Sequence, residues 1–224
     1  MVGVLDVLPD SPNGKPSMLP PRQLNRYLTA CCGAILIIAL SGCYVPLQFD
    51  ADVVINRTGH YEMTFDGDVA WVPLYDKLRR GEINRTKEQE TVAALEKDLG
   101  RDTSFREIEY QRRGMFNVSW HKTGDLLHSK MISFIRRNEK LLTLKYVKTT
   151  GEISMSGTSL SNAQAERLTN RGLNIGGTIK VRTDARVVRH NATSVVDNGM
   201  RWYTYTWRLR SVYDPTPNLV IDVH

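Results

Sequence analysis

A short apolar run from Leu28 to Leu40 divides this chain into two parts, because it ends in Leu40-Ser41-Gly42-Cys43 and the chain is mostly polar from there on. The run has only about two-thirds of the ~20 residues that a transmembrane helix needs. Two cations, Arg22 and Arg26, precede it, and no acidic residue interrupts the stretch. Such a cationic segment, apolar segment and small-residue end are the parts of a secretory signal. The sequence therefore predicts a signal peptide over residues 1–42.

The tetrapeptide Leu40-Ser41-Gly42-Cys43 resembles the lipobox of bacterial lipoproteins. This resemblance implies transfer of a diacylglyceryl group to the Cys43 sulfur, cleavage before Cys43, and acylation of the new amino terminus. One acyl chain anchors a protein only marginally, whereas two or three chains hold it firmly at ~0.8 kcal/mol per buried CH2. An uncleaved N-terminal anchor helix is the alternative interpretation of the same run.

Residues 1–17 precede a second methionine, Met18, and show no periodicity. They contain three prolines, so we expect either a mis-assigned start or a disordered extension. A signal that starts at Met18 has the ordinary length of ~15–30 residues.

Composition limits the chemistry of the part that would follow cleavage. Cys31 and Cys32 lie in the signal, which leaves Cys43 as the only cysteine of the mature chain. Disulfides, thiol catalysis and cysteine metal sites are then excluded. The full chain carries a net charge of +6. Outside the cytoplasm, a mild positive charge favours lipid head groups and envelope polymers as partners, and we expect no nucleic-acid partner.

Alternation of apolar and polar residues predicts that strands dominate the chain after Cys43. The expected strands are 49–56, 60–65, 105–111, 115–121, 141–147, 152–157, 178–184, 185–190, 200–210 and 219–223. The sequence Asp66-Gly67-Asp68 is expected to end the second strand. Asn198-Gly199 is typical of a two-residue hairpin turn. Tyr203, Tyr205 and Trp207 share one face with Leu209 and are expected in the core.

Two principal helices are expected between these strands. The first runs from Thr86 to Leu99, with a capping box formed by Thr86 and Gln89 and a stop at Gly100. The second runs from Ser161, which caps it, to Arg171. Residues 71–80 are a short irregular or helical piece, and 125–134 are a weaker helical segment. The pattern predicts an α+β domain over 49–224 with mainly antiparallel sheet, preceded by an extended tether over 43–48.

Residue patterns for catalysis or metal binding are not found. No pair among the five histidines has the spacing of a metal site, and a calcium loop starting at Asp66 would place Lys77 where the ligand Glu belongs. No G-x-S-x-G motif is present. We therefore expect no catalytic residues, no metal and no cofactor.

Basic residues near the end of the chain predict a charged sheet face. Lys180 and Arg182 lie opposite apolar neighbours in one expected strand, and Arg208 and Arg210 do so in another. If these strands pair, one face is basic and suited to anionic lipid. The neighbouring pair Arg201 and Trp202 is a candidate surface anchor for lipid or glycan. The alternative is an ordinary solvated face of a half-buried sheet.

The mature chain also resembles the LppM-type lipoprotein domain. The features that carry the resemblance are a lipidated cysteine followed by "DADVVINRTGHYEMTF", a helix rich in Glu and Lys, and a tail "VRTDARVVRHNATSVVDNGMRWYTYTWRL". This resemblance implies an α+β fold similar to BON domains, a surface location, and no known catalytic residues.

These observations predict a membrane-anchored envelope lipoprotein that acts as a non-catalytic binding or scaffolding domain, against anionic lipid or an envelope polymer. One alternative is a subunit of an envelope protein assembly, and another is an enzyme on cell-wall or lipid substrates. Tyr44 follows Cys43 where lipoproteins retained in the inner membrane carry aspartate. In a diderm, that resemblance favours an outer-membrane anchor with the domain facing the periplasm.

Overall fold

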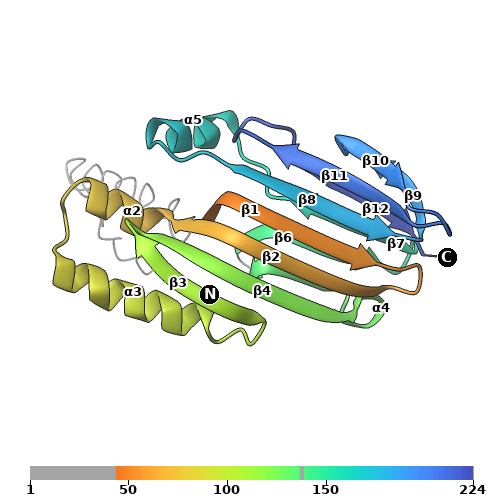
Figure 1. The fold of residues 1–224 in the computed structure, drawn as a ribbon, viewed down its shortest axis with the longest axis horizontal. Helices are drawn as coiled ribbons and strands as arrows, with labels where there is room; N and C mark the ends of the chain where they lie inside the picture. Colours follow the sequence, from red (N-terminus) through yellow and green to blue (C-terminus); the bar gives the residue numbers. More distant parts are fainter. Residues whose placement is uncertain (1–43, 137–138, 224) are drawn as a thin grey trace, which may run out of the picture. The chain divides into compact units, whose positions relative to one another are not determined.

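A computed structural model describes residues 44–136 and 139–223, which form two β-sheets and four helices (Figure 1). The apolar run and the Leu40-Ser41-Gly42-Cys43 motif lie outside the described residues. The predictions of a signal peptide and of acylation at Cys43 therefore stay predictions.

The larger sheet has seven strands in the order β10-β11-β8-β1-β2-β4-β3. Their bounds are β1 Tyr44–Ile55, β2 His60–Trp71, β3 Phe105–Arg112, β4 Met115–Asp125, β8 Gly176–Thr183, β10 Ser194–Asp197 and β11 Tyr203–Leu209. Strands β1 and β8 are parallel, and the other neighbours in this sheet are antiparallel.

The smaller sheet has five antiparallel strands in the order β5-β6-β7-β12-β9. Their bounds are β5 Met131–Arg136, β6 Glu139–Val147, β7 Glu152–Gly157, β9 Arg186–His190 and β12 Asn218–Asp222. The helices are α2 Val72–Arg79, α3 Arg85–Leu99, α4 Leu126–Ser129 and α5 Asn162–Asn170. The α+β class with mainly antiparallel sheet is confirmed.

One core holds the two sheets together, because side chains from both belong to the same buried cluster. Phe134 of β5 stacks on Phe65 of β2 with ring centroids 4.0 Å apart. It also meets the edge of Trp120 on β4 at 5.4 Å. Tyr205 and Trp207 of β11 are buried as expected, but Tyr203 is 37% exposed because it lies at the first position of the strand, beyond the core.

The tether expected over 43–48 is wrong for every residue that the structure describes. Strand β1 begins at Tyr44, which pairs with Trp71 of β2. Tyr44 and Val45 are each only 5% exposed. Their apolar side chains are worth more in the core than in a solvated linker, so the fold starts directly after Cys43.

Two other predictions of secondary structure, the end of the second strand and the helix over 125–134, differ from the structure. Strand β2 runs through Asp66-Gly67-Asp68, because Gly67 has φ +146 and a Cβ there would lie 2.3 Å from the Gln48 carbonyl oxygen. Glycine thus allows the close approach of a bulge instead of ending the strand. The helical segment expected over 125–134 is only the single turn α4, after which β5 pairs with β6.

The caps and the last hairpin differ in detail from the sequence pattern. Helix α3 is capped by Asn84, which accepts a hydrogen bond from the Lys87 N–H at 2.9 Å, and not by Thr86. The Ser161 cap of α5 is confirmed. Strand β11 starts at Tyr203 rather than Met200, because positive φ angles at residues 199–201 form a longer turn than Asn198-Gly199 alone predicts.

Candidate functional site

The larger sheet has two distinct ends, which its register defines. At the Tyr44 end, β1 begins, Gln48 is level with Gly176 of β8, and Leu209 closes β11. At the far end, Ile55 is level with Thr183, and β11 begins beside it. In Figure 1 the Tyr44 end lies beside α2 and α5, and the far end lies beside the β1–β2 turn and β10.

An apolar cavity of about 80 Å³ lies between the two sheets at the Tyr44 end. This is several times the ~10–15 Å³ that one water molecule needs. Its wall is formed by Tyr44, Phe49 and Ala51 from β1, Phe65 from β2, and Leu141 and Leu142 from β6. An apolar lining of this kind accepts apolar groups of a ligand.

The cavity shares one rim with a second and more polar hollow of about 110 Å³. The shared residues are Thr158, Leu160, Ile175, Leu209 and Pro217. Polar side chains of the second hollow, including Ser211, Asp214 and Thr216, lie outside this rim. The arrangement combines an apolar interior with a polar mouth, which suits an amphiphilic molecule.

Hydrogen bonds fix the elements around the mouth. The Arg171 guanidinium, which follows α5, bonds Asp76 of α2 at 2.8 Å, and the Tyr75 hydroxyl donates to the Arg171 carbonyl at 2.8 Å. Asn174 donates to the Arg210 carbonyl at 2.8 Å and accepts from the Val212 N–H at 3.2 Å. The mouth is therefore largely preformed, which lowers the entropic cost of binding.

The cavity wall carries little chemistry. The mouth contributes one carboxyl, Asp214, which accepts from the Arg210 N–H at 2.6 Å. Within the described part of the chain, no three His, Cys, Asp or Glu side chains gather as they would around a metal ion. Burial and the Glu88 carboxylate raise the pKa of Tyr110 to about 12, but Tyr110 lies on β3 outside the cavity wall.

The structure separates the six residues expected to form one basic surface. The Arg182 guanidinium lies 5.8 Å from the Trp202 ring centroid at the far end, and Arg201 is exposed beside them. Arg208 and Arg210 are exposed at the Tyr44 end, about 20 Å away along β11. Lys180 lies between the two groups.

Acidic residues also interrupt the expected basic face. Strand β1 is the neighbour of β8, and its exposed Asp52 is level with Lys180. Asp50 lies two residues earlier on the same face. Strands β8 and β11 pair as the expectation required and bring Lys180, Arg182 and Arg208 to one face, to which β1 adds acidic residues. Binding of an anionic surface by these residues stays a prediction.

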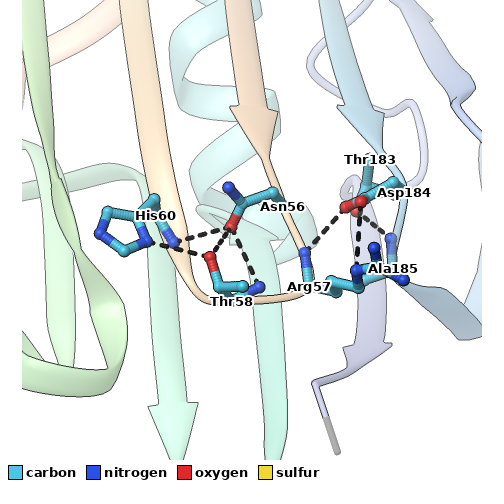
Figure 2. A network of polar contacts seen from close by, with 7 residues as sticks. All are labelled: Asn56, Arg57, Thr58, His60, Thr183, Asp184 and Ala185. Atoms are coloured by element: carbon cyan, nitrogen blue, oxygen red, sulfur yellow. Dashed lines mark hydrogen bonds and ion pairs between the residues drawn. The ribbon is translucent and has the colours of Figure 1, made fainter.

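Polar contacts fix the turns of the far end (Figure 2). The Asn56 side-chain oxygen accepts hydrogen bonds from the N–H of Thr58 at 3.0 Å and of His60 at 3.1 Å. Asp184 accepts from the Arg57 N–H at 2.8 Å, which joins the β1–β2 turn to the connection after β8. This end is thus rigid but polar, unlike the apolar Tyr44 end.

A scan against protein-family models finds no match, and a search of curated proteins finds no similar protein. Among solved structures, the chain is similar to the folded domain of LppM from Mycobacterium tuberculosis, with 12% identity, a TM-score of 0.38, and 79% of this chain and 89% of that chain covered. It is also similar to an M1 zinc metallopeptidase from Deinococcus radiodurans, with 12% identity, a TM-score of 0.31, and 80% of this chain and 42% of that chain covered. At these scores neither likeness carries an argument about function.

The sequence pattern does not reveal the cavity. Tyr44 was expected in a tether, and Leu160 and Ile175 lie just outside α5, where apolar residues form no periodic pattern. The available signal for the cavity was the pair of apolar residues, Leu160 and Ile175, that flank the short helix α5.

None of the helices in residues 44–136 and 139–223 has the length and apolarity that a bilayer crossing needs.

Proposed function

We propose that this protein is an envelope lipoprotein, acylated at Cys43, whose domain binds the apolar chain of a lipid between its two sheets without catalysing a reaction. The observation that carries the proposal is the apolar cavity with a polar mouth at the Tyr44 end. The cavity takes a hydrocarbon segment, and the mouth leaves a polar head group in water.

The position of the cavity relative to Cys43 supports the same function. Tyr44 lines the cavity and already belongs to β1, so an acyl anchor on Cys43 would hold this end of the sheet at the bilayer surface. A lipid would then reach the mouth without crossing open water. Arg208 and Arg210 are exposed beside Asp214 at this end and are positioned to attract an anionic head group.

The proposed location is the cell envelope, with the domain facing the periplasm from the outer membrane if the organism has two membranes. Mass spectrometry of the N-terminal peptide from membrane fractions tests the anchor. We expect a diacylated or triacylated peptide that begins at Cys43, and loss of the modification in Cys43→Ser. An unmodified peptide that continues upstream of Cys43 would contradict the proposal.

Titration of the full-length protein in detergent with a fluorescent long-chain fatty acid tests the cavity. We expect saturable binding to the wild type and at least an about tenfold weaker affinity in Leu160→Trp, because the indole would fill the half-buried mouth. The matched control is Leu127→Trp in α4, which replaces a half-buried leucine at the far end. Equal affinity in all three proteins, or no saturable binding, would refute the cavity as the site.

A further inference from the structure

We propose that a second site, centred on Trp202 at the far end, binds a glycan chain with one sugar ring stacked on the indole. This goes beyond lipid binding and does not depend on it. Trp202 lies in the turn between β10 and β11 and is half-buried. Its ring borders two open hollows on the outer face of the larger sheet.

The two hollows are shallow and open, and their lining suits a carbohydrate. One measures about 460 Å³ and includes Asn56, His60 and Glu62. The other measures about 440 Å³ and includes Arg182 and Thr204. Trp202 is the one aromatic ring that lines both hollows, and the surrounding amide, carboxylate, imidazole and hydroxyl groups match sugar hydroxyls as donors and acceptors.

The Arg182 guanidinium packs against the Trp202 indole, 5.8 Å from the ring centroid. The backbone that carries the indole is fixed by the turn, because the backbone N–H of Trp202 donates to the Gly199 carbonyl at 3.0 Å and the Trp202 carbonyl accepts from the Asn198 backbone N–H at 2.8 Å. A sugar stacks its C–H groups on a rigid aromatic face, so this preorganisation lowers the cost of binding.

The opposite wall of the larger hollow is also preorganised. The Asn56 oxygen is occupied by Thr58 and His60, and Figure 2 shows its amide nitrogen pointing away from those contacts. Glu62 accepts a hydrogen bond from the His121 ring at 2.9 Å, which fixes one carboxylate oxygen. Amide and carboxylate groups fixed in this way are the usual means by which a polar site orients hydroxyl groups.

Charge and position favour a glycan over a bilayer as the occupant. Glu62 and Asp52 lie on the same face as Arg182 and Lys180, and their charges would repel anionic lipid. Strand β1 has twelve residues, which places the far end about 35 Å from Tyr44 along the strand. A chain-like polymer can reach a site at that distance from the anchor.

Binding of a tetramer of N-acetylglucosamine and co-sedimentation with purified peptidoglycan test the proposal on the full-length protein in detergent. We expect saturable binding by the wild type and at least about tenfold weaker binding by Trp202→Ala. Trp202→Phe is expected to keep part of the affinity. Arg189→Ala, at an exposed arginine of β9 that lines neither hollow, is the control and is expected to bind as the wild type does.

Three results would overturn the glycan site, of which the first two concern the glycan probes. One is the absence of saturable binding to both probes by the wild type. The other is an affinity of Trp202→Ala within about twofold of the wild type while its thermal unfolding midpoint is unchanged. The third result is binding to anionic phosphatidylglycerol vesicles that depends on Trp202, without binding to either glycan. This result would assign the surface to lipid and overturn the glycan site. The fatty-acid titration is unaffected by these outcomes, so the two sites fail or succeed separately.

Discussion

The Tyr44 end and the far end of the larger sheet share the same strands but present opposite surfaces. At the Tyr44 end the two sheets leave an apolar cavity between them, bordered by loops that flank α5. At the far end polar turns meet, and the hollows lie on the outside of the sheet around Trp202. A single sheet thus offers an interior site at one end and an exterior site at the other.

The difference between the two ends follows from the directions of the strands. Because β1 and β8 are parallel, their beginnings and the end of β11 meet at the Tyr44 end. Tyr44, the residue after Cys43, therefore lies beside the cavity, and Trp202 lies at the opposite end of the sheet. The basic residues expected on one face are spread along the sheet, with Arg182 and Arg201 at the far end and Arg208 and Arg210 at the Tyr44 end.

The largest expected effect comes from the core that joins the two sheets and supports both ends. Phe134 is fully buried and stacks on Phe65. Phe134→Ala is expected to lower the free energy of unfolding by about 3–5 kcal/mol in urea titrations. Val188→Ala, at a position 46% exposed, is the control and should change it by less than about 0.5 kcal/mol. A loss below about 1 kcal/mol for Phe134→Ala would mean that the two sheets do not share one core.

Ion pairs at the two ends are expected to differ in strength. Arg171 and Asp76 at the Tyr44 end are 2.8 Å apart with side chains 17% and 13% exposed, whereas Arg57 and Asp184 at the far end are 3.6 Å apart and Arg57 is 62% exposed. Arg171→Ala should cost about 2–3 kcal/mol of unfolding free energy. Arg57→Ala should cost at most about 1 kcal/mol. Equal costs for the two variants would remove this contrast between the ends.

The capping box of α5 offers a smaller test of the mouth. Ser161 accepts from the Gln164 N–H, and Gln164 accepts from the Ser161 N–H in return. Ser161→Ala should lower the unfolding free energy by about 1 kcal/mol and weaken fatty-acid binding. Ser159→Ala, at an exposed serine of the same loop, should change neither quantity. A Ser161→Ala protein with unaltered stability would show that the cap does not fix the mouth.

A pH dependence of stability is expected at Tyr110. Burial and its hydrogen bond to Glu88 raise the Tyr110 pKa from 10.0 to about 12. Because the folded state favours the neutral phenol, this contribution to stability is complete below pH 10 and is lost as the pH rises toward 12. Urea unfolding between these pH values should show a decline in the wild type that is shallower in Tyr110→Phe. Identical slopes would contradict the shift.

Local patterns in the sequence predicted much of the fold. The alternation in Met115 to His121, with Phe116, Val118 and Trp120 buried, was confirmed in β4. Arg113 and Gly114 form the expected turn, both with positive φ. The Ser161 cap was also correct. These features depend on neighbours a few residues apart, which the sequence displays directly.

Features that depend on distant contacts could not be predicted. Strand β10 has only four residues, all exposed, and it forms by pairing with β11. The cavity brings Phe49 together with Leu141 and Pro217, which lie on three strands or loops far apart in the chain. The contact between Arg182 and Trp202 follows from a turn longer than Asn198-Gly199 indicated.

Photolabelling with a long-chain fatty acid that carries a terminal diazirine tests the central claim most directly. The labelled full-length protein is digested and the modified peptides are identified by mass spectrometry. We expect saturable labelling of peptides that contain Leu141, Leu160 or Leu209, which surround the cavity at the Tyr44 end. Labelling concentrated on peptides around Met200 and Trp202, or labelling that unlabelled fatty acid does not displace, would contradict the assignment of lipid to the interior site.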